Sequence, residues 1–416
     1  MDPLSSRPEI TARSSFFPQI FRAFLYRDFR IMWLGSFTST TGTFMQQVAL
    51  SWLILQLTGM SFFLGLTSFL AQLPLVLFSV IGGVFADRVD RRKLLIFSQA
   101  VQMTTALILA GLIFFDQIEI WHFLVLAFVT GLGQAFGGPA SQALIPGLVK
   151  RNDLPNAIAL NSIQFNLARV VGPMLAAAVI VVFGVVYCFT FNGFSFLAVI
   201  VSLLLINTSF RPQKTKETMV NQIKAGIQFV LRRNALRHLM FLGFVSTFCG
   251  VPILTLLPAF VRGVYGKGEI TYSWMMSIAG AGAVVGALLY ASLSRFSRRG
   301  LLALWSQLAL AFLLGAFALS TQWIVASVFL FGAGICLIGL FASITSLVQL
   351  ATIEEMRGRV MSLFFLAFRG GMPAGDLTAG LMADSFSEPV SILLLSFLLA
   401  SSSVTFLVFG NTVKKL

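Results

Sequence analysis

The sequence predicts an all-α integral membrane protein: twelve transmembrane helices in two six-helix bundles related by pseudo-two-fold symmetry. Three observations predict this fold: the composition, a charged loop that occurs twice, and the distribution of basic residues. Of the 416 residues, 57% are hydrophobic and only 11% are charged, whereas soluble domains carry about 25% charged residues. The apolar runs are long and do not alternate with period two, so we expect helices and not barrel strands.

The apolar runs define the expected spans, because crossing the hydrocarbon takes about 20 mainly apolar helical residues. The spans are 31–57, 62–86, 94–115, 120–140, 156–182, 185–207, 236–261, 270–292, 301–319, 323–347, 358–383 and 389–410. They divide the chain into a cytoplasmic lead-in (1–30), an N-terminal bundle (31–207), a cytoplasmic linker (208–235), a C-terminal bundle (236–410) and a cytoplasmic tail (411–416). Within the linker, residues 220–231 suit a surface helix or a solvated tether equally.

Two repeated segments indicate duplication of one six-helix unit. The charged segment Asp87–Arg92 aligns with Ser294–Arg299, 207 residues later. Arg169 and Gly172-Pro173 have counterparts in Arg369 and Met372-Pro373, at an offset of 200. Both repeats run in the same direction, so the two halves should be related by an axis along the membrane normal.

The basic residues predict the topology. Of the 29 lysines and arginines, 25 lie at the chain termini, in the alternate loops on the same side, or at the first two residues of the spans that follow these loops. By the positive-inside rule, both termini are then cytoplasmic. The net charge of +14 is therefore a topology signal that also suits contact with membrane lipids, and it does not indicate binding to nucleic acid.

Three ionisable residues inside the spans are the leading functional candidates. An arginine near mid-membrane costs at least about 2.5–3.5 kcal/mol, so Arg169 should face a cavity or a partner. Ser162 and Asn166 share its helical face, which suits an anionic group, a proton-dependent carboxylate or a purely structural arginine. Asp376 is the only acidic residue well inside a span and is the leading candidate for proton coupling, with Arg369 two turns away. A fixed Arg369–Asp376 pair that locks the helix is the alternative.

Polar side chains within other apolar runs are candidates for lining a cavity, although each also suits a helix–helix hydrogen bond. Besides Ser162 and Asn166 they are Gln46, Gln47, Gln72 and Gln134. Three residues are expected to bend helices: Gly172, Pro173 and Pro373.

Other chemistries lack their motifs. The two histidines are isolated and no Cys/His/Asp cluster has metal-ligand spacing, so neither a metal nor another cofactor is expected. The chain has no phosphate-binding loop of the P-loop type, so we expect no nucleotide site and no ATP-driven pump.

The segment Gly83-x-Phe85-Ala86-Asp87-Arg88-x-Asp90-Arg91-Arg92 resembles the signature loop of the major facilitator superfamily. The segment Ala168-x-x-x-Gly172-Pro173 resembles the antiporter motif of its fifth helix. Residues 375–380 look similar to enterobactin-type siderophore exporters and macrolide efflux proteins. The resemblance implies a conformational latch at Gly83 and Asp87, with Arg88, Arg91 and Arg92 as further members. On physical grounds the partner of Asp87 is a helix N-terminus or Arg359. The alternative for the arginines of the loop is a role in orientation and contact with anionic lipids alone.

We therefore expect a secondary transporter of the bacterial inner membrane and not an enzyme. The expected activity is proton-coupled export of an amphipathic small molecule, siderophore or drug-like, by a monomer through alternating access. The alternatives are an importer or uniporter in the same fold, a membrane-embedded lipid enzyme, and a non-transporting sensor.

Overall fold

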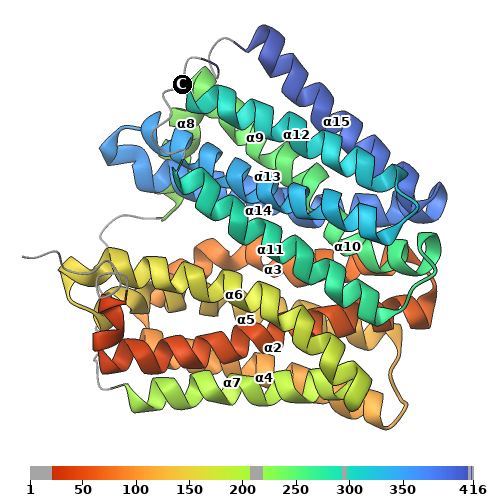
Figure 1. The fold of residues 1–416 in the computed structure, drawn as a ribbon. Coiled ribbons are helices and arrows are strands. Elements are labelled where there is room, and N and C mark those ends of the chain that lie inside the picture. Colours follow the sequence, from red (N-terminus) through yellow and green to blue (C-terminus); the bar gives the residue numbers. More distant parts are fainter. Residues whose placement is uncertain (1–20, 207–218, 293–297, 411–413, 415–416) are drawn as a thin grey trace, which may run out of the picture.

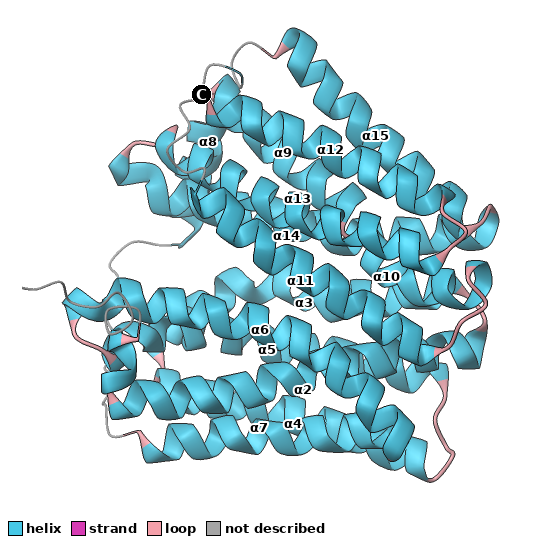
Figure 2. Cartoon of the chain, in the orientation of Figure 1, coloured by secondary structure: helices cyan, strands magenta, loops and turns pink. Residues whose placement is uncertain are grey.

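The structure is a computed structural model that describes residues 21–206, 219–292, 298–410 and 414. The side chains of residues 79–88 and 219–223 lie outside this description. Within the described ranges the regular structure is helical, joined by short loops (Figure 2).

The first half of the chain forms six long helices after a short lead-in. The lead-in is the 3-10 helix η1 (Arg22–Leu25), and a second 3-10 turn, η2 (Arg151–Asp153), precedes the fifth long helix. The long helices are α2 (Arg27–Thr58), α3 (Ser61–Arg88), α4 (Arg91–Phe114), α5 (Ile120–Leu148), α6 (Leu154–Val182) and α7 (Val186–Leu205).

The second half begins with the amphipathic helix α8 (Met219–Leu231). It continues with α9 (Asn234–Gly250), α10 (Pro252–Ala259), the π-helical segment η3 (Phe260–Val264), α11 (Glu269–Ser292), α12 (Arg299–Leu319), α13 (Trp323–Leu350), α14 (Glu354–Ser385) and α15 (Glu388–Phe409).

These helices match the expected spans within a few residues at most ends, with one clear exception. The span predicted over 236–261 is confirmed as the membrane-length segment Asn234–Val264, but it is interrupted, because α9 ends at Gly250 and α10 starts at Pro252. Proline has no N–H to donate to the preceding turn and its ring collides with that turn, so the helix is interrupted there. The break lets α10 contact both α2 and α3 of the first half.

Ten helical segments of the described chain are long and apolar enough to cross a membrane. The helices α2 and α14, with 32 residues each, also run along the molecule but are more polar. Both begin with charged residues, and α14 carries Arg369 and Asp376 at its middle.

Figure 1 shows two groups of helices, one from each half of the chain. In the first half α3 packs on α5, α4 on α5 and α7, and α2 on α6 and α7. The equivalent pairs recur in the second half: α11 on α13, α12 on α13 and α15, and α9 on α14 and α15. The halves meet through α3 with α14 and α6 with α11. The two-fold relation that the repeats predict superposes the α3–α14 pair on the α11–α6 pair.

Small residues permit this close packing. A Cβ on Gly131 of α5 would collide with the carbonyl oxygen of Ala71 on α3, and one on Gly282 of α11 would collide with that of Phe331 on α13. Membrane helices approach closely at such positions because van der Waals contact, and not the hydrophobic effect, drives their association. The two helix pairs, α3 with α5 and α11 with α13, are equivalent under the two-fold relation.

The helices define two ends of the molecule. We call the end where α2 begins and α15 ends the termini side, and the opposite end the far side (Figure 1).

Candidate functional site

Asp376 lies at the contact between the halves, on the face of α14 that packs against α3. Its side chain is 1% exposed. Its Oδ2 accepts a hydrogen bond from the hydroxyl of Ser68 at 2.5 Å and one from Nε2 of Gln72 at 3.3 Å. Oδ1 has no hydrogen bond of standard geometry, although Thr255 of α10 faces the same carboxyl group. A carboxyl group contributed by one half is therefore enclosed mainly by hydroxyl and amide groups.

One close contact explains why the two helices approach so tightly at this point. A Cβ on Gly65 of α3 would collide with the backbone carbonyl oxygen of Asp376. One turn further along α14, a Cβ on Gly380 would lie 2.8 Å from the carbonyl oxygen of Ser61. The two glycines let the backbones touch and so bring Ser68 within reach of Asp376.

On the far side a second carboxylate joins the halves. Asp384, near the end of α14, accepts hydrogen bonds from the backbone N–H groups of Ser61 (2.8 Å) and Phe62 (2.9 Å), and Glu388 accepts one from the Ser61 hydroxyl (3.2 Å). The first N–H groups of a helix have no partner within it and carry partial positive charge. Asp384 therefore caps α3 from the opposite half.

Another far-side bond joins the halves nearby. Nη1 of Arg262, in η3, donates to the carbonyl oxygen of Leu55 at 2.9 Å. The rings of Trp52 on α2 and Tyr272 on α11 stack with centroids 6.2 Å apart. The far side is closed by contacts between the halves.

The α6–α11 contact holds Arg169 at its edge. A Cβ on Gly280 of α11 would lie 3.0 Å from the carbonyl oxygen of Arg169, and the hydroxyl of Ser277 donates to the carbonyl oxygen of Val170 at 3.1 Å. The Arg169 side chain is half-buried. It has no hydrogen-bond or ion-pair partner within the ranges that the structure describes.

Arg369 is exposed, and it forms no ion pair with Asp376. The two residues are seven positions apart and so share one face of α14. That face is packed against α3 at Asp376 but open at Arg369, two turns nearer the termini side. On α6, Ser162 lies seven residues before Arg169 and is exposed in the same way. Both contacts between the halves are therefore closed toward the far side and open toward the termini side.

The four glutamines divide by partner. Gln46 accepts a hydrogen bond from Nδ2 of Asn192 at 2.6 Å, and Gln134 donates to Gln102 at 3.3 Å, both within the first half. Gln72 bonds across the halves to Asp376. Gln47 is exposed in the middle of α2. Of the four glutamines, only Gln47 has an exposed side chain, as a residue that lines a cavity must have.

Other polar candidates of α6 bond locally. Asn166 donates to the carbonyl oxygen of Ser162 at 2.8 Å, and Ser162 donates to that of Ile158 at 3.2 Å. Gly172 is a close-packing position, because a Cβ there would lie 2.5 Å from Cβ of Phe44. Helices α6 and α14 continue through Pro173 and Pro373.

In the charged loop, two arginines bind within the first half. Arg91 donates to the carbonyl oxygen of Ala143 at 3.1 Å, and Arg92 to those of Leu204 (2.8 Å) and Ile206 (3.2 Å). Asp90 caps α4 by accepting from the backbone N–H of Arg92 at 2.9 Å. Cations suit the C-terminal carbonyl groups of a helix, so Arg92 anchors the end of α7.

The structure describes the remaining latch candidates only in part. The side chains of Gly83, Asp87 and Arg88 lie outside the described residues. Arg359 lies in the second turn of α14, where Gly226 of α8 packs against its Cβ.

The lead-in is fixed to the first half through Asp153, which is buried. Arg22 pairs with this carboxylate at 3.0 Å, and the Tyr26 hydroxyl donates to it at 2.6 Å. The hydrogen bond to Asp153 raises the pKa of Tyr26, because ionising the phenol would remove the donated proton and set two negative charges side by side. The part of the predicted cytoplasmic lead-in before residue 21 lies outside the described residues.

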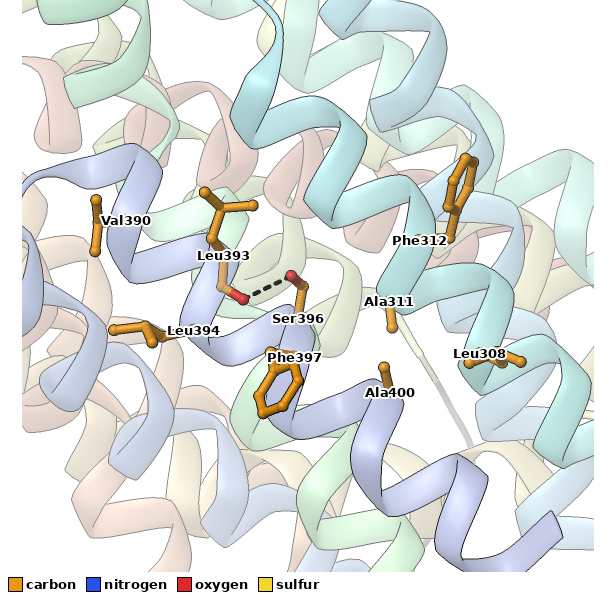
Figure 3. A pocket seen from close by; sticks show the side chains of 9 residues that line it. All are labelled: Leu308, Ala311, Phe312, Val390, Leu393, Leu394, Ser396, Phe397 and Ala400. Atoms are coloured by element: carbon orange, nitrogen blue, oxygen red, sulfur yellow. Dashed lines mark hydrogen bonds between the residues drawn. The ribbon is translucent and has the colours of Figure 1, made fainter. Parts of the chain in front are cut away.

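A cavity of about 650 Å³ lies apart from these residues, between α12 and α15 (Figure 3). Its lining is apolar except for Ser396, whose hydroxyl donates to the carbonyl oxygen of Leu393 in the same helix at 2.8 Å. None of the candidate residues lines it, so this cavity is not the site. Within the described ranges, no group of three His, Cys, Asp or Glu side chains is placed to hold a metal ion.

Two helical bundles meet through symmetry-related contacts, and three ionisable residues lie at mid-helix, one of them the buried Asp376. These features define a multi-pass membrane transporter. A family model described as "transmembrane secretion effector" matches residues 20–413. The chain belongs to this family of the major facilitator superfamily, and it is a transporter, not an enzyme.

Relatives of known function are transport proteins. The chain is 24% identical to macrolide efflux protein A of Streptococcus pyogenes, over 86% of this chain and 89% of that protein. It is 25% identical to the staphyloferrin A transporter of Staphylococcus aureus, over 85% and 88%. It is 25% identical to the enterobactin exporter EntS of Escherichia coli O9:H4, over 81% and 80%.

Solved structures share the fold. The nucleoside transporter NupG has a TM-score of 0.73 at 13% identity, covering 92% of this chain and 99% of that one. A bacterial homologue of the human lysosomal transporter Spinster, in an inward-facing and unoccupied conformation, has a TM-score of 0.69 at 12% identity, covering 93% and 96%.

Sequence reasoning missed Asp384, Glu388 and Ser68. Asp384 and Glu388 bracket the loop between the last two spans, and an acidic pair facing the start of another helix is the signal that was present. Ser68 carries no sequence signal, because its partner is 308 residues away.

Proposed function

We propose that this protein is a proton-coupled exporter of the bacterial inner membrane that moves an amphipathic small molecule by alternating access. The observation that carries the proposal is the position of Asp376, buried where the two halves meet. Rocking of one bundle against the other separates α3 from α14, so it removes the donors Ser68 and Gln72 and opens the carboxyl group to water.

The physical reason for coupling is the cost of burying a charge. A carboxylate enclosed without a cation is far costlier than a protonated carboxyl group. Protonated Asp376 therefore favours the conformation closed on the far side, and deprotonated Asp376 favours its opening. If the proton binds from the far side and leaves toward the termini side, each cycle moves one proton inward.

The direction of export follows from topology and relatives together. The charge distribution supports cytoplasmic termini, which makes the far side periplasmic. The conformation described here is then open to the cytoplasm, where an exporter takes up its substrate. The names of the relatives, an efflux protein and a siderophore exporter, support a drug-like or siderophore-like substrate.

The test is flux of dansylated amphipathic probes in proteoliposomes. We expect an imposed pH gradient to accelerate flux of at least one probe about tenfold or more and to reverse its direction when the gradient is reversed. Probe flux that does not depend on the pH gradient contradicts the antiport mechanism. Probe accumulation in deletion and overexpressing cells tests direction: lower accumulation on overexpression supports export, and higher accumulation supports import.

A further inference from the structure

The two halves present the same three residues at equivalent places near the middle of the membrane. Ser162, Phe165 and Arg169 of α6 repeat as Ser362, Phe365 and Arg369 of α14. Arg169 lies 15 residues after Leu154 and 13 before Val182. Arg369 lies 15 after Glu354 and 16 before Ser385. At about 1.5 Å per residue, both arginines are about 20–24 Å from either end of their helix.

Each arginine lies on a helix that contacts the opposite half. Arg369 shares its face of α14 with Asp376, which packs against α3 of the other half. Arg169 lies beside the α6–α11 contact, where its backbone touches Gly280 of the other half. An arginine that faced lipid at this depth would be penalised by at least about 2.5–3.5 kcal/mol. Both guanidinium groups therefore face the space between the halves, on the side where the halves diverge.

Neither charge is neutralised within the ranges that the structure describes. The Asp376 carboxyl group, the acidic group nearest in sequence to Arg369, is held by Ser68 and Gln72. Thr255 also faces Asp376, from α10. The acidic residues Asp384 and Glu388 lie at the far side, bound to α3. The middle of the molecule thus carries two guanidinium groups open toward the termini side.

Apolar surface lies beside each charge. Phe165 is 49% exposed and Phe365 is 40% exposed. The ring of Phe165 packs edge-on against Phe44 of α2, with centroids 5.5 Å apart. Gln47, one turn beyond Phe44, is exposed and offers a hydrogen-bonding amide. Each half therefore presents a cation beside an aromatic ring.

We propose that the transported molecule is an amphipathic organic anion, bound by Arg169 and Arg369 from opposite halves with its apolar part against Phe165 and Phe365. Guanidinium groups bind carboxylate and similar oxyanions through paired, charge-assisted hydrogen bonds. An anion held by both halves also links them, so its binding is sensitive to their relative position. This inference rests on the proposed transport function but does not depend on proton coupling.

The test is equilibrium binding of three dansyl probes that differ in charge, measured by fluorescence anisotropy with the full-length protein in detergent micelles. The probes are dansylglycine (anionic), its amide (neutral) and dansylcadaverine (cationic). We expect dansylglycine to bind at least tenfold more tightly than its amide, and the cation most weakly. Equal binding of the three, or no binding of the anion, overturns the proposal.

Variants assign the preference to the two arginines. Arg169→Gln and Arg369→Gln should each weaken dansylglycine binding at least tenfold and leave amide binding within twofold, whereas Arg369→Lys should retain part of the preference. Arg151→Gln, at an exposed position of the turn η2, removes an equal charge elsewhere and should bind like the parent. A preference unchanged in both glutamine variants overturns the assignment.

The two proposals fail separately. If the protein binds the anion selectively but shows no gradient-driven flux, the proposal of proton coupling is contradicted and the proposal of an anion site is retained. If all three probes bind equally and show gradient-driven flux at equal rates, the proposal of a proton-coupled transporter is retained and the proposal of an anion site is contradicted.

Discussion

The carboxylate of Asp384 caps helix α3 of the opposite half, accepting a 2.8 Å hydrogen bond from the backbone N–H of Ser61. The same carboxylate accepts from Phe62 at 2.9 Å. A helix cap normally comes from the same chain segment. Here it is supplied across the boundary between the halves, so α3 is fully capped only while the far side is closed.

Removing this cap should open the far side. We expect Asp384→Ala to shift the equilibrium by about 1–3 kcal/mol, the range for a helix cap and for hydrogen bonds to a charged group, which is about 5–150-fold in population. The measurement is the distance between spin labels at Gln117→Cys and Thr321→Cys, in far-side loops of the two halves, with the three native cysteines replaced. Asp116→Asn, an exposed carboxylate whose positive φ asparagine tolerates, is the control. An unchanged distance distribution contradicts the capping role.

Neutralising Asp376 should separate binding from coupling. Asp376→Asn keeps the shape of the side chain and imitates its protonated form, so the far-side-closed conformation should be favoured at every pH. We expect probe binding to remain within about threefold and gradient-driven flux to fall at least about tenfold. Flux assays in proteoliposomes, with Asp116→Asn alongside, test this. Coupled flux at the parent rate would remove Asp376 from the mechanism.

Adding one methyl group to α3 should hold the halves apart. In Gly65→Ala the new Cβ meets the carbonyl oxygen of Asp376, and overpacking of this kind costs about 1–3 kcal/mol. The cost falls on the closed conformation alone, so we expect reduced flux with thermal stability within a few degrees of the parent. Gly111→Ala on α4, where a Cβ meets nothing within 4 Å, is the matched control. Equal flux in the two variants would show that the contact at Gly65 is not limiting.

The charged loop gives a matched pair of carboxylates. The basic residues of the loop account for the topology signal by themselves, so topology does not explain Asp87. Its counterpart in the second repeat is Ser294. We expect Asp87→Asn to lower the flux at least about tenfold through loss of the latch. Asp90→Asn makes the same change of charge three residues away but should retain activity, because asparagine caps helices as well as aspartate. Similar losses in both variants would assign the effect to loop charge and not to Asp87.

Much of the fold follows from local sequence. The thickness of the hydrocarbon fixes the length of an apolar run, so the ends of most helices were predicted within a few residues. The repeats predicted that the two halves are related by a two-fold axis, and the structure shows the pairs through which they meet, α3 with α14 and α6 with α11. The break at Val251 was missed. Hydropathy does not register a proline within an apolar run, although its backbone chemistry ends the helix.

The site was predictable only in part. Arg169, Arg369 and Asp376 stand out because a charge inside a span is costly wherever it points. Their partners do not stand out. Gln72 was a candidate for lining the cavity, yet it bonds to a carboxyl group 304 residues away. Asp384 belongs to α14 but caps α3, across 323 residues.

By itself, the sequence determined the class of protein, the number and length of its apolar segments, their two-fold repetition and the residues whose charge needs a function. These properties follow from the free-energy cost of placing polar groups in hydrocarbon, and this cost applies to each segment separately. The tertiary structure decided which of those charges are satisfied. Asp376 is enclosed by α3 while Arg369, on the same face of the same helix, is open, because the two halves touch at one level of the membrane and diverge at the next.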